Sequence, residues 1–315
     1  MTKLHNGTGG LMENAKNILI TGGSGMIGRR LTALLRKAGY VVSHLGRSRK
    51  TQDVRTFLWD PGRKEIEPGA FENVDIIIHL AGAGVADKRW DASRKKEILL
   101  SRTQSSSFLQ EILSNEPHHV NAFISASGIS YYGLKANVAP RVEADAPGKD
   151  FMAEVTAAWE YEVDKIGNAG LRVVKMRTGV VLSRAGGALE KLAMPVKFFA
   201  GAPLGSGKQV VNWIHLDDLC RLYMKAIEDP SMTGPYNAVT PHPVTNRMLT
   251  EEIARALKKP LWLPPVPGFI VRLIAGEVAK VVLEGGPISS GKIEKAGFEF
   301  QFPAIREALE DLLSA

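Results

Sequence analysis

Cysteine is nearly absent from this sequence: Cys220 is the single cysteine among 315 residues. One cysteine excludes a disulfide framework and a cysteine metal cluster. Cys220 falls within an apolar, helix-like pattern over residues 216–227, which predicts a small core residue and not a nucleophile. The seven histidines show no ligand spacing, and His118 and His119 follow a proline in an expected loop. We therefore expect no metal site.

Long apolar runs are also missing. No stretch approaches the roughly 20 apolar residues that cross a bilayer, and the N-terminus lacks the basic-then-apolar pattern of a secretory signal. We therefore expect a cytoplasmic protein without a membrane partner. Residues 1–15 are polar and glycine-rich, which predicts a disordered or tag-like tail, with Met12 as an alternative natural start.

Basic residues exceed acidic ones, giving a net charge of +7. They are dispersed, without the aromatic-interleaved strip typical of nucleic-acid binding, so we expect no nucleic-acid partner. Hydrophobic residues make up 44% and charged residues 23%, as in ordinary globular proteins. A local basic excess over residues 29–50 indicates a site for a phosphorylated small molecule. For Arg36, Lys37 and Lys50, a solvated basic face is the alternative.

What the sequence does contain is an apolar run at residues 18–20 that leads into glycines spaced three apart. A helix-like pattern begins immediately afterwards. This combination predicts a buried parallel strand, a tight turn and a helix N-terminus directed at a phosphate. We expect the pyrophosphate of a dinucleotide to contact Gly22, Ser24, Gly25, Met26, Ile27 and Gly28.

Strand and helix patterns alternate along the following 150 residues. We expect helices over 26–38, 91–115 and 151–168, and strands over 40–45, 54–59, 74–80, 122–127 and 171–177. Such alternation predicts an α/β fold with a doubly wound, mainly parallel sheet. After residue 182 the rhythm changes to a helical stretch opening at 186–187, a loop over 201–207 and a strand over 209–214. A helix that Asp217 caps, a short strand over 236–238 and a closing amphipathic helix with Leu309 follow.

Several motifs together make the chain resemble an extended or atypical short-chain dehydrogenase/reductase. They are residues 21–28, 80–82, 89–90, 101–103, 125–133, 159–160, 177–182 and 205–218. Within that superfamily the chain is similar to the epimerase-like branch, often labelled nucleoside-diphosphate-sugar epimerase homologue or cell-division inhibitor. The resemblance covers residues 16–315. It implies an NADP-binding Rossmann domain over 16–185 and a smaller, mostly helical substrate-binding region over 186–315, of which about 208–240 returns to the Rossmann core.

The choice of cofactor depends on Arg47, which comes 19 residues after Gly28 at the end of the second expected strand. NAD enzymes usually carry an acid there, whereas an arginine accommodates the 2′-phosphate of NADP. Arg47 and Ser48 together offer a planar cation and hydroxyl and backbone donors, so we expect NADP, with Arg29 as a helper. The alternative is an ordinary surface arginine.

Further cofactor contacts are implied by the resemblance alone. The superfamily passes the turn after its fourth strand beneath the adenosine ribose, and the matching residues are Leu80, Ala81 and Gly82. Arg102, with Glu97 five residues earlier, would reach back toward the cofactor. A salt-bridged helix face is the competing interpretation of Glu97 and Arg102.

The catalytic residues are where the sequence departs from the superfamily. Ser127 matches the serine that polarises the substrate oxygen, but the usual helical tyrosine and lysine fall on Met152 and Thr156 if Glu160 aligns with the superfamily's glutamate. The strings Tyr131/Lys135 and Tyr161/Lys165 are interpreted as chance matches. We take Tyr132 as the candidate proton donor, with packing as the equal alternative. For Tyr131 packing is favoured, and for His215 a bond to a backbone carbonyl.

Two hypotheses of function follow. The first is an NADP(H)-dependent oxidoreductase or epimerase acting on a small polar carbonyl or alcohol, or on a nucleotide-sugar-like substrate. The second is an NADP-binding sensor or scaffold with little or no turnover, which the absent tyrosine–lysine pair favours. A homodimer is compatible with either hypothesis.

Overall fold

A single large β-sheet forms the centre of the protein in the computed structural model, which describes residues 16–49, 53–134 and 139–314. Its strand order is β11-β7-β6-β5-β1-β2-β3-β4, and every pair is parallel except β3 with β4. The strands are β1 Asn17–Thr21, β2 Val41–Gly46, β3 Thr56–Asp60, β4 Glu65–Ile66, β5 Ile76–His79, β6 Ala122–Gly128, β7 Arg172–Thr178 and β11 Gly234–Ala238. The direction of winding reverses between β1 and β5, so the expected doubly wound fold is confirmed.

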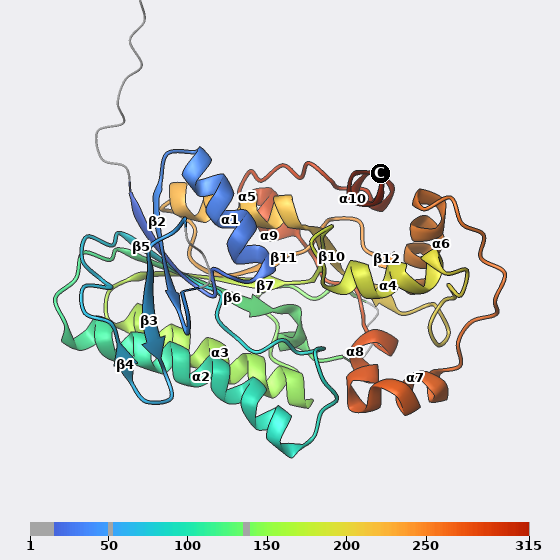
Figure 1. Cartoon of the computed structure of the whole chain (residues 1–315), viewed down its shortest axis with the longest axis horizontal. Coiled ribbons are helices and arrows are strands. Elements are labelled where there is room, and N and C mark those ends of the chain that lie inside the picture. Colours follow the sequence, from blue (N-terminus) through green and yellow to red (C-terminus); the bar gives the residue numbers. More distant parts are fainter. Residues whose placement is uncertain (1–15, 50–52, 135–138, 315) are drawn as a thin grey trace, which may run out of the picture.

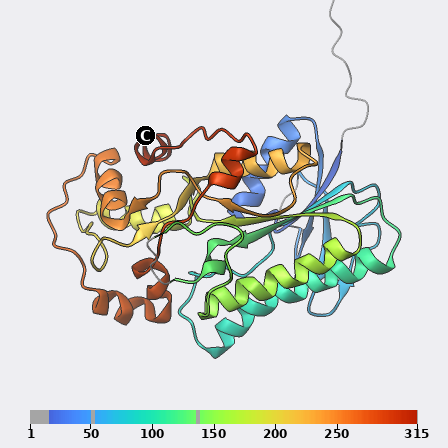
Figure 2. The same ribbon diagram turned by 180° about the vertical axis from the view of Figure 1, so that it is seen from behind.

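Helices cover both faces of this sheet (Figures 1 and 2). One face packs against α1 (Met26–Lys37), α5 (Leu216–Glu228) and α9 (Gly291–Lys295), and the other against α2 (Ala92–Asn115) and α3 (Phe151–Asn168). Alternate residues of β1 supply the two cores: Ile18 and Ile20 point to the α1 side, and Leu19 points to the α2 side. Because parallel strands are buried on both faces, these strands are apolar throughout.

The C-terminal part extends the molecule beyond one end of the sheet (Figure 1). It contains β8 (Val180–Leu182) paired with β10 (Trp213–His215), β9 (Val210–Val211) paired with β12 (Val244–Thr245), and the helices α4 Ala188–Lys197, α6 Asn246–Ala256, α7 Gly268–Ala275, α8 Ala279–Leu283 and α10 Ile305–Leu313. Two 3₁₀ turns, η1 (Ile129–Tyr132) and η2 (Gly276–Val278), complete the described structure. A separate core forms here around Trp213 and Leu309.

Two local expectations are corrected. The strand expected over 209–214 is broken at Asn212, whose side chain donates to Gly286 O and accepts from Ile288 N–H, so β9 and β10 pair with different strands. Helix α5 begins after His215, whose Nδ1 accepts the N–H of Asp217. Asp217 is therefore not the cap; its carboxylate instead binds Arg30 at 2.7 Å. Among the described residues no helix has the length and apolarity needed to span a membrane.

Candidate cofactor and substrate site

The glycine turn after β1 is packed so tightly that side chains are excluded. Gly22 has φ +70°, and a Cβ there would lie 2.9 Å from the carbonyl carbon of Leu80. A Cβ on Gly28 would lie 2.6 Å from Gly22 O, and the Gly25 N–H closes the turn onto the same oxygen at 3.0 Å. The turn therefore lies directly against the end of β5. The sequence predicts the bound pyrophosphate at this edge of the sheet.

The N-terminus of α1 fits an anionic group. Its cap residue is Gly25, which supplies no side-chain hydrogen bond, and the first turn contains no acidic residue. Within the described part of the chain, the N–H groups of Met26, Ile27 and Gly28 have no hydrogen-bond partner. Free N–H groups and the positive end of the helix dipole together form an anion site, so the residues present fit a pyrophosphate.

The glycine turn is held in place by a buried polar cluster. The sequence analysis did not predict this cluster. Thr21 Oγ1 accepts the N–H groups of Leu80 and Ala81 at 3.1 Å each and lies 2.8 Å from His79 Nδ1. The other ring nitrogen of His79 lies 3.2 Å from the hydroxyl of Ser105 on α2. Burial lowers the pKa of His79 to about 3, so the ring is neutral and links β1, β5 and α2 through hydrogen bonds.

A second histidine supports the turn from β2. A Cβ on Gly23 would meet the His44 ring at 2.5 Å, so this backbone lies directly on the imidazole. His44 Nε2 is 2.9 Å from Thr32 Oγ1 on α1, and burial lowers the pKa of His44. In the sequence, only the extra glycine at position 23, directly after Gly22, could have indicated this contact.

Arg47 and Ser48 leave the sheet beside the glycine turn, because β2 pairs in register with β1. Both side chains are exposed. Among the described residues no hydrogen bond or ion pair engages the Arg47 guanidinium, whereas Arg49 binds Glu67 at 2.8 Å and Arg30 binds Asp217. Arg29 donates to Ser24 O at 3.0 Å and so braces the turn itself. Arg47 is thus the uncommitted cation next to the anion site.

For three other basic residues near the turn, the alternative to a phosphate site was a solvated basic face. Arg36 and Lys37 occupy the last turn of α1, at the opposite end of the helix from the anion site. They therefore belong to a solvated face. Lys50 lies outside the described residues.

Glu97 and Arg102, both predicted near the cofactor, do not pair with each other. Glu97 is exposed and pairs with Arg94 at 2.6 Å. Arg102 lies partly buried under the loop after β5, where its Nη1 donates to Ala83 O at 3.1 Å and its guanidinium lies 5.2 Å from the centre of the Trp159 ring. Burial, followed by the charge of Arg94, lowers the pKa of Arg102 to about 10. Arg102 supports the Leu80–Gly82 backbone, and nothing in the geometry directs Glu97 toward a cofactor.

Ser127, the last residue but one of β6, lies within a buried charged cluster. Its hydroxyl donates to Glu160 Oε1 at 2.6 Å, and Arg177 binds both oxygens of Glu160 at 2.7 and 2.8 Å. Lys175 lies 3.2 Å from Glu160 and 2.7 Å from Asp164. Burial acts to raise the pKa of Glu160, but Arg177, Lys175 and Ser127 outweigh it and hold the pKa below its usual value. The Ser127 hydroxyl donates its hydrogen bond to the Glu160 carboxylate and so helps to position that carboxylate.

Tyr132 does not have the environment expected of a proton donor to substrate. Its hydroxyl donates to Asn237 Oδ1 at 2.7 Å and accepts from Arg177 at 2.9 Å, and the residue is buried. Burial raises the pKa of Tyr132 to about 12 despite the nearby Arg177. These contacts favour the packing alternative for Tyr132, in which the side chain ties η1 to β11.

Tyr131 has the opposite character. It is half-buried, and Arg177 lies 3.5 Å from the centre of its ring. Within the described residues its hydroxyl has no hydrogen-bond partner, and that hydroxyl is not among the buried polar atoms. Tyr131 therefore combines a fixed ring with a free hydroxyl at the carboxyl end of β6.

Met152 and Thr156, the positions predicted for the superfamily's tyrosine and lysine if Glu160 aligns with its glutamate, make structural contacts. Met152 is buried, and the Thr156 hydroxyl bonds to Met152 O and lies 2.8 Å from Ser130 Oγ. Tyr161 is 64% exposed on the outside of α3, where Lys165 pairs with Glu162. Tyr161/Lys165 is accordingly a surface pair, and Lys135 lies outside the described residues.

His215 is structural. Besides capping α5, its ring stacks on Phe302 with centroids 3.9 Å apart, and Nε2 lies 3.3 Å from Asp311. The sequence reasoning expected a backbone bond through a carbonyl; the ring instead accepts a backbone N–H. Burial lowers the pKa of His215 against the opposing effect of its acidic neighbours.

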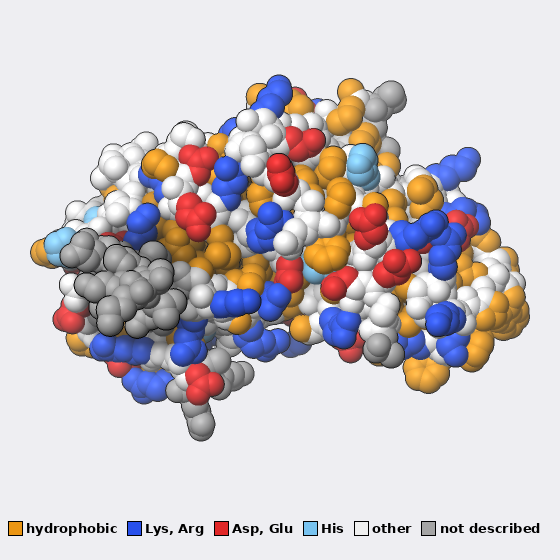
Figure 3. Space-filling view, turned by 90° about the horizontal axis from the view of Figure 1, so that it is seen from above, with side chains coloured by type: hydrophobic (Ala, Val, Ile, Leu, Met, Phe, Trp, Pro, Cys, Tyr) orange, Lys and Arg blue, Asp and Glu red, His pale blue; other side chains and the backbone are white. Residues whose placement is uncertain are grey.

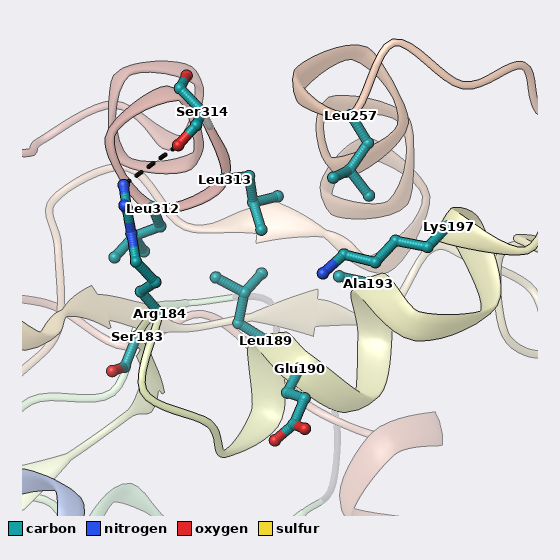
Figure 4. A pocket seen from close by; sticks show the side chains of 10 residues that line it. All are labelled: Ser183, Arg184, Leu189, Glu190, Ala193, Lys197, Leu257, Leu312, Leu313 and Ser314. Atoms are coloured by element: carbon teal, nitrogen blue, oxygen red, sulfur yellow. Dashed lines mark hydrogen bonds between the residues drawn. The ribbon is translucent and has the colours of Figure 1, made fainter.

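A hollow of about 260 Å³ lies between α4, α6 and α10 (Figure 4). Its lining includes Leu189, Lys197, Leu257 and Leu313, and Arg184 at its edge donates to Ser314 O. No lining residue comes from the glycine turn, β6 or η1, so this hollow does not include the predicted cofactor turn, Ser127 or Tyr132. Among the described residues no cluster of three or more His, Cys, Asp or Glu side chains is arranged to hold a metal.

The switch in strand order, the side-chain-free turn and the open helix N-terminus define a dinucleotide-binding α/β protein of the Rossmann type. Comparison with known families narrows this class. The chain belongs to the NAD dependent epimerase/dehydratase family, whose model matches residues 18–240, and residues 266–312 match a domain of unknown function, DUF1731. The sequence-based resemblance to the epimerase-like branch is confirmed.

Individual relatives extend over almost the whole chain. An epimerase family protein of Staphylococcus epidermidis is 34% identical over 95% of this chain and 100% of its own length. The chloroplastic SDR39U1 homolog of Arabidopsis thaliana is 34% identical over 96% of this chain and 88% of its own. The crystal structure of human epimerase family protein SDR39U1 (isoform2) with NADPH is similar at TM-score 0.85 and 29% identity, covering 94% and 99% of the two chains.

Proposed function

We propose that this protein is an NADP(H)-dependent oxidoreductase or epimerase that acts on a small polar carbonyl or alcohol, or on a nucleotide-sugar-like substrate. The observation that carries the proposal is the uncommitted Arg47 beside an open, side-chain-free helix N-terminus. A guanidinium is suited to a phosphomonoester, which NADP has and NAD lacks. The NADPH in the similar human structure supports the same choice. The nucleotide-sugar alternative rests on the family name alone.

In this proposal each group has a limited task. The N–H groups of α1 hold the pyrophosphate, Arg47 and Ser48 hold the 2′-phosphate, and the Leu80–Gly82 backbone, supported by Arg102, underlies the ribose. The bound cofactor supplies or accepts a hydride at nicotinamide C4. The protein then has to provide orientation and a proton.

The cofactor assignment is tested with Arg47→Glu. We expect NADPH binding to weaken about 10- to 100-fold or more, because a charge-assisted hydrogen-bonding cation of about 1.5–3 kcal/mol is replaced by a repelling carboxylate. NADH binding should change little. Titration calorimetry with both nucleotides measures the difference, and Lys37→Glu, an identical charge change at the far end of α1, is the matched control. Equal weakening of both nucleotides would refute the phosphate role of Arg47.

For the proton we propose Tyr131. Reduction of a carbonyl places a hydride on its carbon and a proton on its oxygen, and oxidation reverses both transfers. Ser127 and Tyr132 already donate their hydroxyl protons to Glu160 and Asn237. Tyr131 retains an uncommitted hydroxyl among the described residues, on a ring that the Arg177 guanidinium holds in place.

Consumption of NADPH with a panel of carbonyl compounds tests this role. With an active substrate, Tyr131→Phe should lower kcat by about 10²- to 10⁴-fold, the usual contribution of general acid catalysis, without changing NADPH affinity. Tyr161→Phe, the same change at an exposed position, should leave kcat unaltered. Full activity of Tyr131→Phe would rule Tyr131 out as the donor.

The sensor or scaffold hypothesis has one specific support: if Glu160 aligns with the superfamily's glutamate, Met152 and Thr156 stand where its proton-transfer pair would be. It predicts tight NADPH binding without NADPH consumption for any member of the panel. Turnover that depends on Tyr131 would exclude it.

A further inference from the structure

Exposed apolar side chains are concentrated in the C-terminal part of the protein. Helix α7 has the sequence Gly-Phe-Ile-Val-Arg-Leu-Ile-Ala, yet Val271 is its only buried residue. Phe269, Leu273 and Ile274 are 69%, 73% and 70% exposed. An apolar helix that presents most of its large side chains to water needs an explanation outside the folded chain.

A neighbouring segment adds aromatic residues to this surface. Phe198 and Trp262 are 77% and 68% exposed, and Phe199 is also exposed. Residues 198–205 run beside 259–268: Lys259 lies 4.3 Å from the centre of the Phe199 ring, and the Gly205 N–H bonds to Val266 O. We define the apolar rim as six residues: Phe198, Phe199, Trp262, Phe269, Leu273 and Ile274.

Two residues of this region have a backbone conformation that glycine would adopt more easily. Phe199 has φ +62° and Lys258 has φ +55°. Each directly follows the C-terminal cap of a helix, α4 and α6 respectively. Glycine is common at this position because a side chain there costs roughly 1–2 kcal/mol. The chain instead keeps an aromatic ring at one position and a cation at the other.

Cations surround the rim. They are Lys197, Lys258, Lys259, Arg272 and Lys280, and within the described residues none of them pairs with a carboxylate. Residues 258–284 contain two acidic residues: Glu277 is bound to Lys95 at 2.7 Å, and Glu284 forms no ion pair within the described residues. Figure 3 shows hydrophobic side chains gathered beside Lys and Arg at the right-hand end of the molecule. The rim therefore combines exposed apolar side chains with cations that have no acidic partner among the described residues.

We propose that the apolar rim docks the protein peripherally on an anionic lipid surface. Trp, Phe and Leu side chains enter the boundary between headgroups and acyl chains, while lysine and arginine ammonium and guanidinium groups meet lipid phosphates. A second copy of the chain is a poorer occupant, because a symmetric contact would bring the same five unpaired cations together. This proposal revises the expectation of no membrane partner and is independent of turnover.

Sedimentation with lipid vesicles tests the proposal. The protein should bind vesicles of mixed phosphatidylcholine and phosphatidylglycerol, bind phosphatidylcholine alone much more weakly, and dissociate as salt is raised. Phe269→Ser combined with Leu273→Ser should weaken binding at least about tenfold, because two apolar side chains no longer enter the bilayer. Arg272→Glu combined with Lys280→Glu should abolish the preference for phosphatidylglycerol.

Matched controls make the result specific. Tyr161→Ser removes an equally exposed aromatic side chain from α3, and Arg36→Glu with Lys37→Glu reverses two unpaired charges on α1; neither should alter vesicle binding. Unchanged NADPH affinity of the rim variants shows that they are folded. Failure to bind mixed vesicles, or equal losses in the controls, would overturn the proposal. So would a dimer in light scattering that the Phe269/Leu273 variant dissociates, because the rim would then be a contact between copies.

Discussion

Glu160 shows how one side chain organises the inner end of the candidate site. It is buried, accepts a hydrogen bond from Ser127 and binds Arg177 through both oxygens. Arg177 in turn reaches Tyr132 and lies against Tyr131. The cluster holds as many cations as carboxylates, since Lys175 and Asp164 complete it. Its members therefore depend on one another for charge compensation.

Replacing Glu160 by glutamine should be strongly destabilising. Arg177 and Lys175 would remain buried without full compensation, and removal of one partner from a buried ion pair costs about 3–5 kcal/mol in the free energy of unfolding. Chemical denaturation measures the loss. Glu162→Gln on the same helix, where the partner Lys165 is exposed, is the control and should leave the unfolding midpoint nearly unchanged. A loss for Glu160→Gln no larger than that of the control would contradict the role assigned to this cluster.

At the scale of elements, the sequence predicted best what is local. The strand, turn and helix around Gly22–Gly28 follow from neighbouring residues, and β1, α1 and β2 lie where the periodicity indicated. Apolar periodicity likewise predicted the helices that became α2 and α3. These elements are set by burial and backbone conformation, which spacing along the chain reports directly.

Long-range hydrogen bonding was beyond that kind of reasoning. Tyr132 bonds to Asn237, which lies 105 residues away, and Thr21 lies against His79 at a separation of 58 residues. The contacts of Arg102 were likewise not readable from the sequence, because its partners are a loop and a tryptophan outside its own helix. Identities of polar residues could be read from the sequence, but their partners were decided by the packing of distant elements.

At the scale of the whole molecule, polar groups are distributed unevenly. Around the sheet, buried imidazoles and ion pairs join elements to one another: His44 joins β2 to α1, His79 joins β5 to α2, and His215 joins α5 to the C-terminal segment. Around the apolar rim, by contrast, the cations have no carboxylate partner in the part of the chain that the structure describes. The first group stabilises the fold, and the second is available for an external anionic partner.

The three histidines together predict how stability depends on pH. Burial lowers the pKa of His44, His79 and His215 in the folded protein from the ordinary 6.5, for His79 to about 3. Below about pH 6.5 the unfolded chain therefore binds protons that the folded protein refuses, so the free energy of unfolding falls as pH falls. Each histidine changes the free energy of unfolding by at most about 1.4 kcal/mol per pH unit. The three together change it by at most roughly 4 kcal/mol per pH unit.

Urea unfolding at fixed ionic strength between about pH 8 and pH 5 measures this slope, which should be near zero at the upper end and steepen below the ordinary histidine pKa. His44→Gln should remove about one proton from the linkage, whereas His119→Gln, at an exposed position, should leave the slope unchanged. Acid sensitivity of this size would mark the imidazoles as neutral structural links in the fold. A flat profile would show instead that these rings accept protons without destabilising the fold. The cluster beneath the glycine turn would then have to hold a charged His79.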